Sequence, residues 1–382
     1  MNSVFASEPH GGPDYGELAA LGLRPEDVLD FSTNTNAFGP PPGVLAALAA
    51  CDVTRYPDRH ASPLREALAA RDGVPTDWVL VGAGATGLIW ALALAWLQPG
   101  DTTFIVGPTF SEYAVASRLV QAEIEEWRGL WPVTMEYRFS SAANEHDEPK
   151  RRQSAAIQEL AQAIAAARPR LVWLCNPNNP TGTYLTAGEI AALLPAATNA
   201  LWVLDEAYRP FVIEPWPSVL LLGSGHVVLL RSLTKEWALP GVRLGYLLAP
   251  PDVVARVAAS QPPWSVSAAA IACGLAALRD PDHVARTTAI LRAEAVRLAD
   301  RLRAQGWRVL PSATHFMLIE VGDAAAVRAA LLREHHIQVR NCTSFGLPAF
   351  IRVAARRPEE NERLIEAMSG IKVSDTCQAP GM

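Results

Sequence analysis

The chain has 382 residues, of which 50% are hydrophobic and 19% are charged, and its formal net charge is −6. This length exceeds what one hydrophobic core ordinarily organises, so two domains are expected, and the composition excludes a disordered chain. The negative charge argues against general nucleic-acid binding, because proteins of that class need a basic surface.

Short apolar runs alternate with longer alanine-rich segments of helical period over the first two thirds of the chain. This alternation predicts the α/β class, with a largely parallel β-sheet wrapped by helices. The expected strands are Trp78–Val81, Phe104–Val106, Leu171–Cys175, Leu201–Leu204, Val227–Leu230 and Leu244–Leu248. The expected helices are Pro63–Arg71, Gly87–Leu97, Ser111–Gln121, Ser154–Ala167, Ala187–Leu194 and Pro251–Ala259.

The pattern changes after Pro262-Pro263. The helices expected beyond this point are Ser267–Leu278, Pro281–Gln305, Ala324–Glu334 and Pro358–Met368, and the strands are Met317–Val321, Ile337–Arg340 and Phe350–Val353. We therefore predict a large domain over residues 45–260 and a smaller α+β domain over 261–382, with which an N-terminal arm of residues 1–44 associates. The polar stretch Ser140–Gln153 is expected to be a solvent-exposed loop, and the tail Ser374–Met382 is expected to fray.

The N-terminal segment, the longest apolar stretch and the spacing of the cysteines all bear on the expected cellular location. Residues Met1–Pro13 are not a charged-then-apolar targeting signal, and the longest apolar stretch, Leu88–Leu97, is too short to span a bilayer. The five cysteines have no paired or metal-like spacing, which favours free thiols in a reducing compartment. We therefore expect a cytoplasmic protein with no membrane contact and no metal site.

A glycine-rich turn, Gly82–Gly87, lies between a predicted strand and a predicted helix. It fits the dinucleotide-binding fingerprint G-x-G-x-x-G. A dinucleotide site needs an acidic residue at the end of the next strand, however, and that strand runs into Gly107-Pro108. The turn therefore favours a phosphate at a helix N-terminus, with the hydroxyl of Thr86 as a further donor. A turn that serves packing alone stays open.

Two polar motifs follow predicted strands, where open α/β sheets bind ligands. The segment from Asn176 to Gly182 reads N-P-N-N-P-T-G, and Asp205-Glu206-Ala207-Tyr208 follows the next strand. A carboxylate that emerges from an apolar strand needs a positive partner, such as a protonated heterocyclic nitrogen, because desolvation alone would disfavour its charge. An aspartate that only caps a helix stays open.

Lysine occurs only at Lys150, Lys235 and Lys372, among 33 lysines and arginines. Lys235 follows the apolar run Val227–Leu230, and Arg243 comes soon after it. Only an amine can condense with a carbonyl, whereas arginine stays protonated. This pattern predicts that Lys235 is the covalent anchor of an aldehyde cofactor and that Arg243 holds an anion nearby.

Together these motifs resemble the fold-type I pyridoxal-phosphate enzymes of the aspartate-aminotransferase superfamily, over nearly the whole chain. The resemblance implies a pyridoxal 5'-phosphate cofactor bound covalently to Lys235, with Asp205 paired to its ring nitrogen. Asn179 and Tyr208 would bind the ring hydroxyl oxygen, and Lys235, Asp205 and Tyr208 would be catalytic. The residues implied for the cofactor phosphate are Ala85, Thr86, Ser232 and Arg243.

Two aromatic positions complete the cofactor site implied by this resemblance. Phe110 would stack on the cofactor ring, with Tyr113 as the alternative. Tyr56 matches a tyrosine that these enzymes lend to the phosphate site of a neighbouring subunit. A homodimer with shared active sites is therefore expected.

Further segments resemble the threonine-phosphate decarboxylases of the cobalamin pathway, which are close kin of the histidinol-phosphate aminotransferases. These segments are His10–Gly12, Asp30–Asn36, Gln261–Ser267, Val339–Cys342 and Phe350–Val353. The contacts that they imply with a phosphoamino acid are His10, Gly11, Asn34, Asn179, Arg340 and Arg352. Two arginines suit a substrate with a carboxylate and a phosphate. Surface ion pairs for the arginines and a solvated His10 stay open.

This resemblance implies the decarboxylation of O-phospho-L-threonine to (R)-1-aminopropan-2-yl phosphate and carbon dioxide. The alternatives are an aminotransferase of the histidinol-phosphate type and, on the glycine turn alone, a nucleotide-binding dehydrogenase. The chain departs from the decarboxylase pattern at Ala37, Ser267 and Gly346. These positions lie near the inferred substrate pocket, so they bear on the choice of substrate.

Overall fold

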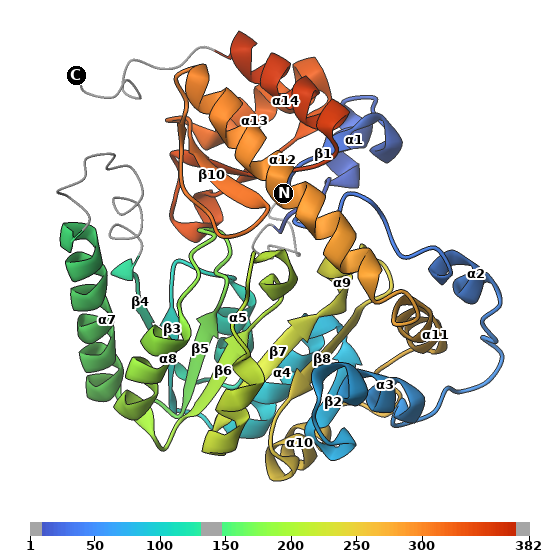
Figure 1. Ribbon diagram of the computed structural model, residues 1–382, viewed down its shortest axis with the longest axis vertical. Coiled ribbons are helices and arrows are strands. Elements are labelled where there is room, and N and C mark those ends of the chain that lie inside the picture. Colours follow the sequence, from blue (N-terminus) through green and yellow to red (C-terminus); the bar gives the residue numbers. More distant parts are fainter. Residues whose placement is uncertain (1–9, 131–146, 372–382) are drawn as a thin grey trace.

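The computed structural model describes residues 10–130 and 147–371, and its centre is a seven-stranded β-sheet (Figure 1). The strands lie in the order β2-β8-β7-β6-β5-β3-β4, and β8 runs in the direction opposite to the other six. Their bounds are β2 (Val79–Ala83), β3 (Thr102–Val106), β4 (Glu123–Trp127), β5 (Leu171–Cys175), β6 (Leu201–Asp205), β7 (Val227–Ser232) and β8 (Leu244–Leu248). The prediction of a mostly parallel α/β sheet is confirmed.

Helices cover both faces of this sheet, because successive strand residues point to opposite sides and most of them are apolar. In β6, Trp202 and Leu204 belong to one hydrophobic core, whereas Leu201 and Val203 belong to the other. The first core includes residues of α3 (Ser62–Asp72), α7 (Asp147–Ala167), α8 (Ala187–Leu193) and α11 (Ala268–Ala277). The second includes residues of α4 (Gly84–Trp96), α5 (Glu112–Leu119) and α10 (Pro251–Ala258).

The C-terminal third forms a separate antiparallel sheet with the strand order β12-β13-β10-β9. Its strands are β9 (Arg308–Val309), β10 (Phe316–Glu320), β12 (Arg340–Asn341) and β13 (Phe350–Ala354). Its helices are α12 (Asp282–Ala304), α13 (Ala324–His335) and α14 (Pro358–Gly370). In Figure 1 these elements group at the top of the view, above the large sheet.

The N-terminal segment joins the C-terminal elements. Strand β1 (Leu29–Asp30) pairs in parallel with β11 (Ile337–Gln338), and Phe31 is fully buried in the C-terminal core. The remaining N-terminal helices are α1 (Tyr15–Ala20) and α2 (Val44–Ala49), and α2 packs against α11. The domain boundaries proposed above, near residues 44 and 260, stay a prediction.

Three expectations about local structure need correction. The predicted loop Ser140–Gln153 is wrong over residues 147–153, which form the first turns of α7, and its remainder lies outside the described residues. The predicted strand Ile337–Arg340 is split, because β11 pairs with β1 whereas β12 pairs with β13. The edge strand β4 was missed because its sequence, Glu-Ile-Glu-Glu-Trp, has too few apolar residues to resemble a buried strand.

Within the two described ranges, no helix combines the length and the apolar character needed to cross a membrane. Cys51, Cys175, Cys273 and Cys342 are free thiols. Cys377 and the tail predicted to fray lie outside the described residues.

Candidate active site

A pocket of about 360 Å³ lies at the carboxyl ends of the central strands and is lined by residues of both sheets' elements. The parallel strands β5, β6 and β7 end at the same edge, so the polar segments that follow them converge there. The predicted site residues that line this pocket are His10, Gly11, Asn34, Thr86, Phe110, Asn179, Tyr208, Lys235, Arg243, Arg340 and Arg352. Asp205, Ala85, Ser232 and Tyr56 are not in its lining.

Lys235 lies on the one-turn helix α9 (Leu233–Glu236), directly after β7. Burial, together with the nearby guanidiniums of Arg352 and Arg243, lowers the pKa of its amine to about 8. The ordinary value is 10.5, so a useful fraction of the amine is neutral near physiological pH. A neutral amine is the form that attacks a carbonyl and that accepts a proton.

In cofactor-free protein, the Lys235 amine is expected to lose its proton near pH 8 rather than 10.5. Between these two values the folded chain binds fewer protons than the unfolded chain, so this group's contribution to folding stability rises with pH across that window. Mass spectrometry of acetylation by acetic anhydride, measured at several pH values, checks the midpoint. A lysine peptide is the reference, and an equal midpoint for Lys235 and the peptide would contradict the assignment.

Asp205 is the last residue of β6, and its carboxylate is buried with two donors on it. The hydroxyl of Tyr113 donates to Oδ2 at 2.7 Å, and the backbone N–H of Ala207 donates to Oδ1 at 2.9 Å. Burial raises the pKa of Asp205, and these two hydrogen bonds oppose the rise. A cationic ligand group beside this carboxylate would favour its charged form, whereas a helix cap would not need the Tyr113 contact.

The N-terminus of α4 and the side chain of Arg243 form a cradle for an anion. Helix α4 begins at Gly84, with φ +72°, and a Cβ on Gly84 would lie only 2.7 Å from Nη2 of Arg243. Ala85 and Thr86 follow in the first turn, where backbone N–H groups have no partner within the helix. The guanidinium of Arg243 also donates to the carbonyl of Pro240 at 3.0 Å, which fixes its direction.

Ser232 is absent from the lining of this pocket, and its predicted role at the phosphate stays a prediction. Its hydroxyl shares a 2.8 Å hydrogen bond with the hydroxyl of Thr234, and the residue lines a second cavity.

Arg340 and Arg352 lie at the other end of the pocket, and both are buried. Arg352 donates to the carbonyl of Ser32 at 2.6 Å and to the side-chain oxygen of Asn179. Arg340 donates to the hydroxyl of Ser344 at 2.7 Å. Their burial rules out the alternative of surface ion pairs. The amide of Asn34 is also buried here, close to the hydroxyl of Tyr208, and its nitrogen and oxygen make no well-formed hydrogen bond with the described residues, so a polar ligand could satisfy it.

The aromatic residues separate into two groups. Phe110 lines the pocket, whereas Tyr113 is fully buried behind it and stacks on Trp173 at 5.0 Å, which favours Phe110 as the residue that faces a ligand ring. Tyr208 packs edge-on against Phe316, with ring centroids 4.8 Å apart. Tyr56 is 79% exposed and stacks on Trp264 at 4.5 Å, away from the pocket. The homodimer with shared sites therefore stays a prediction.

Sequence reasoning missed one acidic residue of the pocket. Glu112, the first residue of α5, accepts a hydrogen bond from Nε1 of Trp90 at 2.9 Å and another from Nε2 of His10 at 3.0 Å. It stands in the quoted segment between Phe110 and Tyr113, two residues after the predicted ring-stacking position. The signal was its place at the start of a helix next to an aromatic pocket residue.

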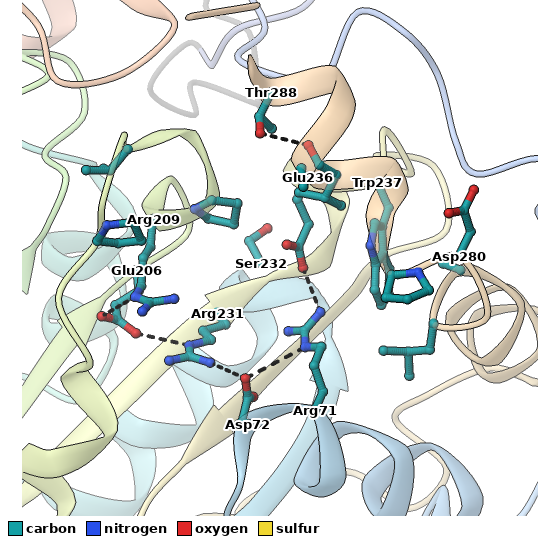
Figure 2. Close-up of a pocket in the computed structure, with 18 of the residues that line it drawn as sticks. Arg71, Asp72, Glu206, Arg209, Arg231, Ser232, Glu236, Trp237, Asp280 and Thr288 are labelled. Carbon is teal, nitrogen blue, oxygen red and sulfur yellow. Dashed lines mark hydrogen bonds and ion pairs between the residues drawn. The ribbon is translucent and has the colours of Figure 1, made fainter. Parts of the chain in front are cut away.

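A network of ion pairs lines a second, larger cavity of about 830 Å³ (Figure 2). Arg231 pairs with Asp72 at 2.6 Å and with Glu206 at 3.0 Å, and Arg71 pairs with Glu236 at 3.1 Å. Glu206 and Glu236 directly follow Asp205 and Lys235 in the chain. The network therefore connects α3 with the two residues that directly follow Asp205 and Lys235. The charged Arg231 within a buried strand was the sequence signal for it.

Two features define a pyridoxal-phosphate enzyme of fold type I. One is the order of the strands in the large sheet, and the other is the lysine, the aspartate and the anion cradle that meet at one edge of this sheet. Comparison with known families agrees: the aminotransferase class I and II family matches residues 26–368. The chain belongs to the aminotransferase class I and II family.

Curated relatives narrow the similarity. A histidinol-phosphate aminotransferase of Symbiobacterium thermophilum is 37% identical over 354 residues, which cover 91% of each chain. The corresponding enzyme of Haloarcula marismortui is 32% identical, over 92% of each chain. Among solved structures, a histidinol-phosphate aminotransferase of Sinorhizobium meliloti in complex with pyridoxal-5'-phosphate has a TM-score of 0.80, 23% identity and 97% coverage of both chains, which supports the fold.

These relatives correct the expected reaction. The prediction of a threonine-phosphate decarboxylase is wrong, because curated relatives that are 31–37% identical over most of the chain are histidinol-phosphate aminotransferases. One solved structure, the L-threonine-O-3-phosphate decarboxylase of Porphyromonas gingivalis, is also similar, with a TM-score of 0.73, 28% identity and coverage of 88% of this chain and 97% of that one. Family membership also removes the dehydrogenase alternative.

The cofactor of this family is pyridoxal 5'-phosphate, and the residues present fit it. The cradle at Gly84 and Arg243 suits its phosphate, and the buried Asp205 suits a cationic ring nitrogen. The low pKa of Lys235 suits attachment to its aldehyde, and Phe110 supplies an apolar wall for its ring.

Proposed function

We propose that this chain transfers an amino group between L-histidinol phosphate and a 2-oxo acid such as 2-oxoglutarate. The observation that carries the proposal is the second anion site of the pocket, formed by Arg340 and Arg352, in a chain whose relatives include histidinol-phosphate aminotransferases at 37% identity. The amino donor ends in a phosphate and the oxo acid ends in carboxylates. Guanidinium groups bind both kinds of anion through paired hydrogen bonds.

Residues at one end of the pocket would hold the cofactor, and residues at the other end would orient the substrate. When bound, pyridoxal phosphate supplies an electron sink that weakens the bonds at the substrate Cα. Asp205, oriented by Tyr113, would pair its negative charge with the ring nitrogen, and Arg243 with the α4 N-terminus would hold the phosphate. Lys235, with its pKa near 8, would accept the proton from Cα of the amino donor in one half-reaction and would deliver a proton to the former oxo carbon of the acceptor in the other.

The far end of the pocket orients the substrate. Arg352 is fixed by the carbonyl of Ser32 and by Asn179, so its guanidinium is held in place before a ligand arrives. The side-chain amide of Asn34, in the same pocket, has its donor nitrogen and its acceptor oxygen available to a ligand. We assign phosphate or carboxylate binding to Arg352, Asn179 and Asn34 together with Arg340. Side chains that are already held in place lose less conformational entropy when the ligand binds.

The experiment is turnover with defined amino donors and acceptors. Holoenzyme with L-histidinol phosphate and 2-oxoglutarate is expected to release glutamate, and leaving out either compound should stop the release. A parallel incubation with O-phospho-L-threonine and no oxo acid is expected to release no carbon dioxide. Glutamate formation that does not depend on histidinol phosphate would contradict the proposed substrate.

A further inference from the structure

Glu112 is the one carboxylate among the described residues that line the active-site pocket. The same lining contains the cations Lys235, Arg243, Arg340 and Arg352. These cations suit the anionic ends of the cofactor and the substrate, so they do not explain why an acid is kept here. A buried carboxylate needs hydrogen-bond donors, and Glu112 is only 8% exposed.

The Glu112 carboxylate is held in a fixed direction by residues of two other segments. The indole Nε1 of Trp90, on α4, donates to Oε2 at 2.9 Å. The imidazole Nε2 of His10, in the N-terminal segment, donates to Oε1 at 3.0 Å. Trp90 thus orients the carboxylate, whereas the His10 side chain is 46% exposed and can be exchanged for another donor.

The surroundings of His10 are those of a site for an aromatic N–H donor. Its ring lies 5.6 Å from the ring of Phe110 in a tilted arrangement, which gives the imidazole an apolar neighbour. Its carbonyl accepts a 3.4 Å hydrogen bond from Arg340, one of the two arginines of the far anion site. An imidazole on Glu112 and an anion on Arg340 are therefore neighbours in this pocket.

We infer that Glu112 determines substrate specificity by accepting a hydrogen bond from the ring nitrogen of an imidazole-bearing amino phosphate, at the position that the His10 imidazole holds in the substrate-free chain. The inference rests on the proposed function and adds to it the group that recognises the ring. His10 competes with the substrate for Oε1, so the chain's own imidazole lowers the apparent affinity for the substrate until it is displaced.

The test compares two amino donors in wild-type holoenzyme and in Glu112→Gln: L-histidinol phosphate, and an aliphatic 2-aminoalkyl phosphate without a ring. Glutamine keeps the size of the side chain but loses its charge. The variant is expected to lower kcat/KM for histidinol phosphate about tenfold, since charged hydrogen bonds are roughly twice as strong as neutral ones. The ratio of kcat/KM for histidinol phosphate to kcat/KM for the aliphatic donor should therefore fall about tenfold. Glu320→Gln, which alters a glutamate paired with Arg308 outside the pocket, is the matched control.

The alternative is a structural latch, in which Glu112 only holds the N-terminal segment. A latch predicts equal losses with both donors, and that result would overturn the inference. His10→Ala separates the two further: competition predicts a lower KM for histidinol phosphate, whereas a higher KM would overturn the shared position. If the wild type transaminates glutamate but not histidinol phosphate, the proposed substrate fails, and the inference fails with it. If it uses histidinol phosphate and Glu112→Gln does so equally well, the inference alone fails.

Discussion

Lys235→Ala is expected to lower kcat for amino transfer by at least about a thousandfold, within the range that a general base supplies. The amine of Lys235 is the group in this pocket that can be both covalently attached to an aldehyde and deprotonated near neutral pH, because burial and two arginines lower its pKa to about 8. The measurement is steady-state turnover of histidinol phosphate with 2-oxoglutarate. Borohydride reduction of the holoenzyme followed by peptide mass spectrometry should place the pyridoxyl group on Lys235.

The matched control for Lys235 is Lys235→Arg. It keeps a positive charge and a long side chain, but a guanidinium cannot be deprotonated in a protein. We therefore expect Lys235→Arg to be as inactive as Lys235→Ala. Activity of the arginine variant within tenfold of the wild type, or a pyridoxyl group on Lys150 or Lys372, would contradict the role assigned to this amine.

Asp72→Ala is expected to destabilise the folded protein by about 3–5 kcal/mol, because it leaves the Arg231 guanidinium in a buried site without one of its two acidic partners. Asp72 accepts from Arg231 at 2.6 Å and from the hydroxyl of Tyr246 at 2.6 Å, and its side chain is 9% exposed. Figure 2 shows Asp72 between Arg71 and Arg231. Urea unfolding followed by circular dichroism, at a fixed concentration of pyridoxal phosphate, measures the change.

Two further variants make this result specific to the network. Asp300→Ala removes an exposed carboxylate that pairs with Arg303 at 3.1 Å, and should change the free energy of unfolding by less than about 1 kcal/mol. Asp72→Asn keeps the shape and one acceptor oxygen, so it should fall between the two alanine variants. Equal unfolding energies for Asp72→Ala and Asp300→Ala would show that the buried network does not contribute as argued.

The cofactor end of the site could be predicted from the sequence because its residues lie in short motifs attached to regular strands. Asp205, Lys235 and the turn at Gly84 each follow a strand that apolar runs made visible, and parallel strands bring their carboxyl ends together. The choice of substrate was not encoded in this way. Arginines that bind a phosphate or a carboxylate suit a decarboxylase and an aminotransferase equally, which is why the sequence motifs favoured the wrong reaction.

The sequence by itself determined the α/β class, the positions of the main strands along the chain, the cofactor and the lysine expected to bind it, since hydrophobic period and local motifs act over a few neighbouring residues. Only the tertiary structure decided which distant residues meet. Tyr113 on Asp205, His10 on Glu112 and Asp72 on Arg231 join positions 92, 102 and 159 residues apart. Such contacts depend on how helices pack on the sheet and on where buried charges find partners, and no local pattern in the chain records either of these.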